Sequence, residues 1–412
     1  MKDATINLTY NKYLKHYKAE KVVIQPEVLR GGIFRGLEDA RRNYTRLTGP
    51  KTCSSKLYTE VWLDRAVSYD IASRKVSGGS LEKHSLPLRK TANFYILFPK
   101  EKLIALRSTL FKEPRDKRKE LWNNFNLPLV KIDTKFKEMV RERNNFASHR
   151  GFSSRIDMAL KFFNIPKKDF NNFNKNVDEV IDYCNLSLAE FKNLPGWFYN
   201  EFNIPCFMCR MSRFPLDSLD RAFNFVVGEH KILERFRNKI VIKLGDESKM
   251  AYKSREDCFE ITINRGINIR HRVTDLIHEL SHVIYYLECF RKKVNPLAVG
   301  AYLREKEATK LEITILKKLS ERIFRALILN DTLSLIRRVL FENELYGNTN
   351  QDLAKLYASI FNKCFKDAKQ ETNVLYLLDE NIIFSPYSTL PHAVACTNLL
   401  HDLINNELNK AG

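Results

Sequence analysis

Apolar residues recur every three or four positions over long stretches of the chain, which is the spacing of one face of an α-helix. Within residues 131–150 this face carries Ile132, Phe136, Met139, Val140 and Phe146. Gly151 follows as a helix-ending glycine. The same pattern predicts two helices on either side of Pro166 within residues 155–186, and more helix over residues 217–238. The chain is therefore expected to be mainly α-helical.

One stretch departs from helical spacing. Residues 239–243 and 259–263 are short, rich in β-branched side chains and partly alternating, and Gly245 and Gly266 supply turns close after them. We predict two strands of a small antiparallel sheet here. The helical pattern returns after Gly266 and holds nearly to the end of the chain.

Residues 1–95 carry the weakest pattern, because short apolar runs alternate with turn signals such as the Ser-Gly-Gly-Ser segment at residues 77–80. We expect an N-terminal helical lobe or cap over residues 1–95 and a larger helical region over residues 96–412. Composition agrees: 14 glycines and 13 prolines are few for 412 residues, so long helices fit better than many short strands.

The chain is basic, with 69 Lys and Arg against 49 Asp and Glu and a net charge of +20. The basic residues are spread out, and the densest cluster, at residues 112–119, is interleaved with acidic ones. This pattern favours a solvated basic surface over a dedicated nucleic-acid groove, so a nucleic-acid partner is not our first expectation.

The sequence also indicates a compartment. No apolar stretch approaches the length needed to cross a bilayer, and the N-terminus has no apolar core of a secretory signal. We therefore expect a cytoplasmic protein that keeps its eight cysteines reduced and has no membrane partner. The CxxC pair, Cys206 and Cys209, has no second metal-binding pair nearby, which favours two buried thiols and leaves a structural zinc site as the alternative.

The candidate chemistry lies at residues 278–282, where an HExxH motif sits inside a helical apolar pattern. His278 and His282 are one helical turn apart on one face, so both imidazoles can reach a single metal ion. Glu279 can lie beside the open position of that ion and take a proton from bound water. We predict one Zn²⁺ per chain, with His278 and His282 as ligands and Glu279 as general base.

A zinc site of this kind needs a third protein ligand. A third histidine ligand further along the same helix is excluded, because position 288 is a glutamate. Glu288 itself is not the third ligand either, because it lies about 240° round the helix from His282 and faces away. The next helix offers Glu305 and Glu307 instead. About 200° of helix rotation separates these two residues, so only one of them can face the metal.

The surroundings of the two glutamates differ. Glu305 shares a face with Ala308, which allows two helices to approach closely, and with Glu312, which can reach the second nitrogen of a ligand histidine. Glu307 shares a more polar face with Lys310. The sequence therefore favours Glu305 as the third ligand and leaves Glu307 as the alternative.

Together these motifs resemble the gluzincin peptidases related to oligoendopeptidase F and thimet oligopeptidase, with carboxypeptidase Taq as a cousin. Residues 136–152 resemble the family's RN..A...G helix, residues 259–264 its strand at the substrate edge, residues 305–312 its third-ligand helix and residues 339–346 a later helix. The resemblance covers roughly residues 130–400. It implies a mainly α, zincin-like fold with a deep channel between two lobes, a small antiparallel sheet beside the HExxH helix, and short oligopeptides as substrates.

The same family has a tyrosine-rich C-terminal segment that binds the substrate carbonyl. This chain keeps one tyrosine in register, Tyr387, and lacks the others. The resemblance makes Tyr387 a candidate donor to the oxyanion, and the alternative is an aromatic residue packed in the core at a helix start. His392 is a second candidate donor, and the alternative there is a surface histidine.

Three functions remain open on the sequence. The first is a zinc metallopeptidase acting on oligopeptides, with His278, His282 and Glu305 as ligands and Glu279 as base. The second is a catalytically weak binding protein with an acidic protein or nucleic acid as partner, suggested by the net charge of +20 and the reduced tyrosine motif. The third is a metallocarboxypeptidase, which shares the chemistry and differs in its products.

Overall fold

The computed structural model of this 412-residue chain describes residues 117, 133, 136–141, 143–145, 147–148, 151–188, 215–245, 248–253, 257–265, 269–294, 296, 300–366, 375–384 and 386–411. Helices dominate the described residues, and the predicted mainly α fold class is confirmed. The expected lobe over residues 1–95 and the Cys206–Cys209 pair lie outside the described residues. The division at residue 96 therefore stays a prediction.

The sheet has three strands in the order β1-β3-β2: β1 (Ile240–Gly245), β2 (Lys249–Lys253) and β3 (Cys258–Asn264). Both predicted strands exist, but the prediction that they pair antiparallel is wrong. β1 and β3 are parallel, with Ile240 opposite Phe259, and β2 pairs antiparallel with the other side of β3. β2, which the sequence analysis did not predict, lies between β1 and β3 along the chain and reverses its direction once more. Its lysine-flanked sequence carries no clear apolar alternation that would have predicted a strand.

This topology also corrects the role suggested for residues 259–264. β3 is the central strand, paired on both sides, so it cannot be the edge that an extended substrate joins. Its inward residues Phe259, Ile261 and Ile263 alternate along the strand and are almost fully buried. Within the described residues, the strands with only one partner are β1 and β2.

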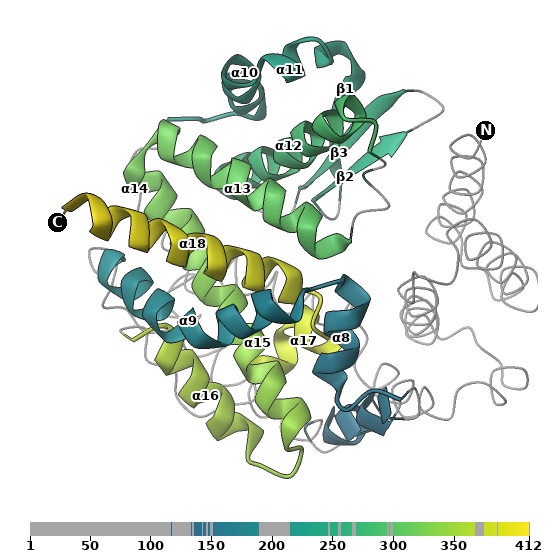
Figure 1. The fold of residues 1–412 in the computed structure, drawn as a ribbon, viewed down its shortest axis with the longest axis vertical. Helices are drawn as coiled ribbons and strands as arrows, with labels where there is room; N and C mark the ends of the chain where they lie inside the picture. The colour runs from purple at the N-terminus through teal and green to yellow at the C-terminus, as the bar shows by residue number, and fades with distance from the viewer. Residues whose placement is uncertain are drawn as a thin grey trace, which may run out of the picture.

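Helices α10 (Leu219–Glu229) and α11 (Lys231–Glu234) and the short η4 (Arg237–Lys239) lead into this sheet. After it come two long helices, α12 (Ile269–Arg291) and α13 (Ala301–Leu319), which lie side by side next to the strands (Figure 1). α12 contacts the sheet through β2 and β3, and its opposite flank packs on α13.

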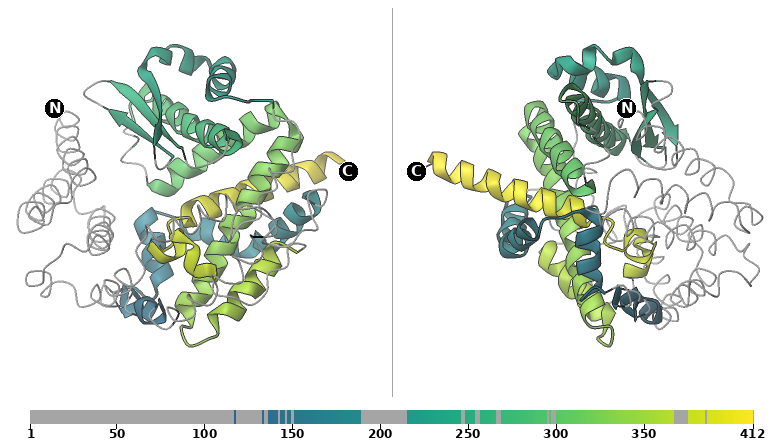
Figure 2. Two further views of the ribbon diagram at one scale, coloured as in Figure 1. Left: turned by 180° about the vertical axis from the view of Figure 1, so that it is seen from behind. Right: turned by 45° about the vertical axis from the view of Figure 1, so that its right-hand side comes forward.

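The second group of helices lies on the other side of α13. It contains α8 (Arg155–Phe163), α9 (Lys167–Ser187), α15 (Asn330–Gly347), α16 (Leu353–Cys364), η6 (Leu375–Leu378) and α17 (Glu380–Phe384). α14 (Glu321–Phe324) and the π-helical turn η5 (Arg325–Leu329) connect α13 to α15. α18 (Leu390–Ala411) packs on both α13 and α9 and so joins the two groups, as the views in Figure 2 show.

Local sequence explains where these helices begin and end. The predicted pair around Pro166 is confirmed: α8 ends at Asn164 in the left-handed conformation, and Pro166 is the N-cap of α9. Gly151 has φ of 79°, as the helix-ending glycine predicted for that position requires. The side chains of Ser154 and Asp352 accept backbone N–H bonds and cap α8 and α16.

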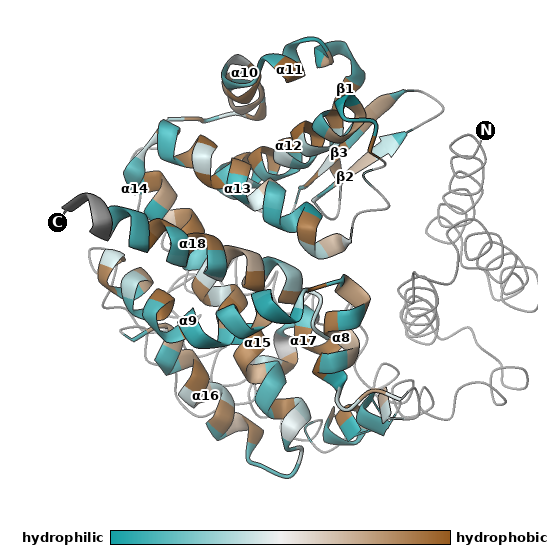
Figure 3. Ribbon diagram, in the orientation of Figure 1, coloured by the Kyte–Doolittle hydropathy of each residue, from teal (hydrophilic) through white to brown (hydrophobic). Residues whose placement is uncertain are grey.

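Packing of one apolar face per helix holds these elements together. Figure 3 shows brown and teal residues alternating along the helices, and the buried core is built from the apolar ones. On α12 the buried face includes Val273, Leu276, Ile277 and Leu280, all 0% exposed. Each fully buried side chain of this size contributes about 1.5–3 kcal/mol. No helix among the described residues combines the length and the apolarity that a bilayer span requires.

Candidate metal centre

The HExxH motif lies in the middle of α12, because the apolar residues around it are those that bind this helix to its neighbours. Leu276, Ile277 and Leu280 are buried, whereas His278 and His282 are half-buried on the flank that meets α13. One helical turn separates the two imidazoles, and their ring centroids are 4.8 Å apart. The packing of α12 therefore holds both rings toward one point beside α13.

Glu305 of α13 faces the same point. Its Oε2 is 3.6 Å from Nε2 of His278 and 3.6 Å from Nε2 of His282. These separations are too long for hydrogen bonds. They match a metal site, because two ligand atoms each about 2.1 Å from a tetrahedral zinc ion lie roughly 3.4 Å apart. The three residues thus form a group whose ligand atoms could share one ion.

Glu305 rather than Glu307 is the carboxylate that the structure brings to the histidines. Glu307 acts on Tyr285 instead: burial raises the pKa of Tyr285 most, Cys289 raises it further, and the charge of Glu307 adds to that rise. It has no ion pair with either histidine. The face that Glu305 shares with Ala308 lies against α12 in the structure, where Ala308 is fully buried.

Glu312, two turns beyond Glu305, contacts the back of His278. Its Oε2 lies 2.9 Å from Nδ1 of that ring, so the imidazole can donate to the carboxylate and present Nε2 to a metal. Burial disfavours the charged imidazole, but Glu312 and Glu305 outweigh it and raise the pKa of His278 well above its ordinary value. The residues needed to orient one ligand histidine are therefore present.

Glu279 is the buried carboxyl beside these ligands, with 8% of its surface exposed. Burial raises the pKa of Glu279, and the two neighbouring imidazoles oppose that rise. For Glu305 the balance is reversed. Burial again acts upward, but the two histidines lower the pKa of Glu305 well below its usual range. Glu279 and Glu305 are therefore in different electrostatic surroundings, because the pKa of Glu279 is raised and that of Glu305 is lowered.

The sequence analysis missed a further carboxyl on the same face. Asp275 lies one turn before Glu279. Ser248, directly before β2, donates a hydrogen bond from its hydroxyl to Asp275 and accepts the N–H of Asn264. Burial raises the pKa of Asp275. The i, i+4 spacing from Asp275 to Glu279 could have indicated in the sequence that the two carboxyls share a face. The contact between Ser248 and Asp275 fixes α12 against the sheet.

His392 is brought to the site from the first turns of α18. Its ring stacks on His278 with centroids 5.2 Å apart and an interplanar angle of 29°. His278, Glu312 and His392 also form a second group of ligand-type atoms within 4.8 Å of one another. The alternative of a surface histidine is therefore wrong for His392. Burial lowers its pKa, with a further downward effect from His278.

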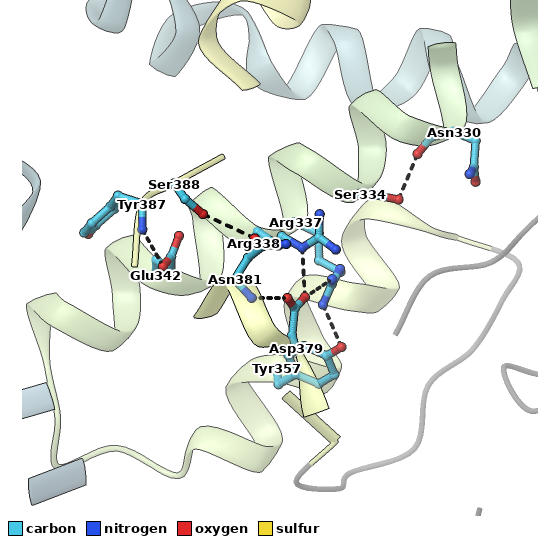
Figure 4. Close-up of polar contacts among 10 residues, drawn as sticks. All are labelled: Asn330, Ser334, Arg337, Arg338, Glu342, Tyr357, Asp379, Asn381, Tyr387 and Ser388. Atoms are coloured by element: carbon cyan, nitrogen blue, oxygen red, sulfur yellow. Dashed lines mark hydrogen bonds and ion pairs between the residues drawn. The ribbon is translucent and has the colours of Figure 1, made fainter. Parts of the chain in front are cut away.

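Tyr387 has a different environment. It is 1% exposed, its ring lies 5.4 Å from that of Tyr346, and its backbone N–H donates to Oε1 of Glu342 at 2.8 Å (Figure 4). Its hydroxyl has no hydrogen-bond partner among the described residues. None of its described contacts is with the HExxH residues. The role of oxyanion donor remains a prediction for Tyr387, and the structure instead packs it in the core before α18.

Comparison with known proteins shows which solved structures have a similar fold. The sequence matches no family model and no curated protein. Among solved structures, PZ peptidase A with an inhibitor superposes with a TM-score of 0.54 at 11% identity, covering 95% of this chain and 86% of that one. A putative oligoendopeptidase F from Bacillus anthracis gives 0.51 at 11% identity, covering 95% and 84%. The chain therefore shares the mainly helical fold of these two structures.

Proposed function

We propose that this protein is a zinc-dependent metallopeptidase that hydrolyses short oligopeptides. The observation that carries the proposal is the equal 3.6 Å spacing of Glu305 Oε2 from the Nε2 atoms of His278 and His282, with Glu279 buried beside them. Oligopeptide substrates are supported by the fold shared with an oligoendopeptidase F. The deep channel that would admit these peptides is still an expectation from the family resemblance.

The donor set supports zinc as the metal. Two imidazoles and one carboxylate are ligands of catalytic zinc sites, which keep a further position open. When bound, Zn²⁺ supplies a Lewis acid that polarises a carbonyl and lowers the pKa of a bound water to about 7. His278, His282 and Glu305 would hold it, and Glu312 would keep the His278 ring in position through Nδ1.

In this proposal Glu279 moves the protons. Its carboxylate takes a proton from the attacking water and passes it to the nitrogen of the leaving amine. The neighbouring imidazoles favour its ionised form, and the burial that raises its pKa keeps it basic enough to accept a proton near neutral pH.

His392 is the better candidate for a donor to the developing oxyanion. Its ring faces His278, and no hydrogen bond to a described residue occupies its nitrogens. A ring N–H held at such a site can stabilise the charge that develops on the substrate carbonyl oxygen. Tyr387, the residue that the family resemblance suggested, has its described contacts elsewhere.

The test combines metal content with peptide cleavage. Purified wild-type protein, Glu305→Gln and Glu307→Gln are each assayed for bound zinc and for hydrolysis of a mixture of quenched peptides. We expect one zinc per chain and cleavage in wild type and Glu307→Gln, and loss of both in Glu305→Gln. Zinc in all three proteins would contradict the ligand assignment. Zinc without cleavage in wild type would favour a binding protein.

A further inference from the structure

Asp169 links three helices, α9, α13 and α18. It lies in the first turn of α9, and its Oδ2 accepts a hydrogen bond from the Tyr302 hydroxyl of α13 at 2.7 Å. Nζ of Lys306, one turn further along α13, lies 3.6 Å from the same oxygen. The main-chain oxygen of Asp169 accepts the side-chain amide of Asn398 of α18 at 2.9 Å. One residue of α9 is therefore bound to both α13 and α18.

These contacts differ from an ordinary surface ion pair, because the groups involved are largely buried. Tyr302 is 2% exposed, and the side chains of Asp169 and Lys306 are 22% and 31% exposed. Burial, and then Asp169, raise the pKa of Tyr302, so its phenol stays neutral and acts as a donor. Nζ of Lys306 also lies 5.7 Å from the centre of the Tyr302 ring. A hydrogen bond to a charged acceptor in such surroundings is stronger than one in water.

The segment that carries Asp169 is itself fixed. α8 ends at Asn164 in the left-handed conformation, and the carbonyl of Pro166, the N-cap of α9, accepts the N–H of Asp169 at 2.9 Å. The start of α13 approaches this corner closely, because a Cβ on Gly300 would lie 2.6 Å from Cβ of Asn164. The corner between α8 and α9 therefore gives the first turns of α13 a firm point of contact.

Tyr302 and Lys306 lie on a different face of α13 from Glu305. They are four residues apart and share one face, whereas Glu305 lies about 60° round the helix from Tyr302. α13 therefore meets Asp169 on one face and the two histidines of α12 on the next. Glu305 Oε2 lies 3.6 Å from Nε2 of each histidine, so a rotation of α13 about its axis would change both distances.

We propose that Asp169 is a positioning residue for the metal centre, because it binds Tyr302 and Lys306 and so fixes the orientation in which α13 presents Glu305. The inference rests on the proposed zinc peptidase function. In this role Asp169 acts through α13 and not by contact with the ion. The competing explanation is that Asp169 only stabilises α9, since an acidic residue in the first turn of a helix does so whatever its side chain binds. Tyr302→Phe separates the two, because it breaks the link and leaves Asp169 in place.

The proposal is tested on the full chain after removal of metal. Competition with a metal-sensitive dye gives the zinc affinity of wild type, Tyr302→Phe, Asp169→Ala and Asp169→Asn. We expect affinity weaker by about fivefold in Tyr302→Phe and about tenfold in Asp169→Ala, with a shifted visible absorption spectrum when Co²⁺ replaces zinc. Asp169→Asn keeps an acceptor for the phenol and should recover most of the affinity. Adding Tyr302→Phe to Asp169→Ala should cost no further affinity, because the link is already broken.

Tyr252→Phe is the matched control. Tyr252 of β2 donates to Oδ1 of Asp257 at 2.7 Å, the same length as the Tyr302 bond, but it does so in the sheet. This variant should keep the wild-type zinc affinity and Co²⁺ spectrum. Unchanged affinity and spectrum in Tyr302→Phe and Asp169→Ala would overturn the positioning role. That conclusion would hold even if both variants unfold at lower urea, because lower stability alone is what a purely structural role predicts.

A measurement on the metal-free protein separates this proposal from the proposed function. Amide hydrogen exchange is followed over residues 301–308 of α13, and we expect it to be faster in Tyr302→Phe and Asp169→Ala but not in Tyr252→Phe. A wild type that binds no zinc would contradict the peptidase proposal, while faster exchange in these two variants would still support the hold of Asp169 on α13. Equal zinc affinity in wild type and both variants would leave the peptidase proposal standing and overturn this one.

Discussion

Two charged clusters in this protein differ in whether their opposite charges are in contact. We call the cluster of Arg337, Arg338 and Asp379 the closed cluster, and that of His278, His282 and Glu305 the open cluster. Around Asp379, opposite charges are in direct contact: Arg337 and Arg338 lie 2.9 and 2.8 Å from its Oδ2, and Arg337 also donates to Tyr357 at 2.6 Å (Figure 4). At the other cluster, Glu305 Oε2 stays 3.6 Å from Nε2 of His278 and 3.6 Å from Nε2 of His282. In the first cluster opposite charges neutralise one another by direct contact and serve the fold, whereas the second leaves a space of the size of a metal ion.

Their positions follow the same division. Arg337 is 0% and Asp379 3% exposed, and this pair joins α15 to the segment before α17. His278, His282 and Glu305 are half-buried where α12 meets α13. A charge cluster that holds helices together is best sealed from water, whereas one that receives an ion and a substrate must stay accessible. The comparison predicts opposite consequences for mutation in the two clusters.

The largest expected effect is at the open cluster. Glu305→Gln should lower peptidase activity on the order of 10³-fold or more, because the metal supplies several kcal/mol of transition-state stabilisation. It should leave the unfolding free energy of the metal-free protein nearly unchanged. Chelation should lower the Tm of wild type and of Glu307→Gln but not of Glu305→Gln. A chelator effect that is equal in all three would argue against the open cluster as the ion's site.

The next effect is at the closed cluster. Arg337→Met should lower the free energy of unfolding by about 3–5 kcal/mol, because it leaves Asp379 with one arginine in a buried setting. Urea unfolding of metal-free protein measures this. Removing both charges with Arg337→Met and Asp379→Asn together should recover part of the loss. Full stability in Arg337→Met alone would mean that the pair does not hold α15 in place.

A third prediction concerns Glu342, a carboxyl beside the closed cluster with no ion-pair partner among the residues that the structure describes. Its folded pKa of about 8 lies above its ordinary value, so the folded state binds the extra proton. Stability should therefore fall as pH rises, by about 2–3 kcal/mol between pH 5 and 7.5. Glu342→Gln keeps an acceptor for the Tyr387 N–H and should remove this slope. Parallel pH profiles for the two proteins would show that Glu342 is not protonated in the folded state.

The smallest effect is at the back of the open cluster. Glu312→Gln should weaken zinc binding by about 10- to 100-fold, because it loses the charged partner of His278 Nδ1 while all three ligands stay. Competition with a metal-sensitive dye measures the affinity. Thr314→Ala, on an exposed position of the same helix, is the control and should bind zinc like wild type. An unchanged affinity in Glu312→Gln would remove its orienting role.

The sequence predicted the open cluster better than the closed one. HExxH fixes two imidazoles and a glutamate by helical periodicity alone, and the small Ala308 on the Glu305 face favoured the carboxylate that lies 3.6 Å from both rings in the structure. The Arg337–Asp379 pair spans 42 residues, and no local spacing rule relates its members. Long-range pairs of this kind depend on how helices pack, which one sequence does not specify.

The same reason explains the errors. The pairing of β1 with β3 depends on β2, whose polar, lysine-flanked sequence gives no period-two signal. The sequence left a surface position as the alternative for His392, because no local pattern shows that the start of α18 lies over His278. Residues on one helix were therefore predicted well, and contacts between distant helices or strands were found only in the structure.

The most direct test of the central claim uses Glu279, which the account requires for turnover but not for metal binding. Bound zinc and peptide cleavage are measured together in wild type and Glu279→Gln. The account predicts one zinc per chain in both, with cleavage lowered by about 10²- to 10⁴-fold in the variant. Cleavage by Glu279→Gln at the wild-type rate, or absence of zinc from the wild-type protein after loading, would contradict it.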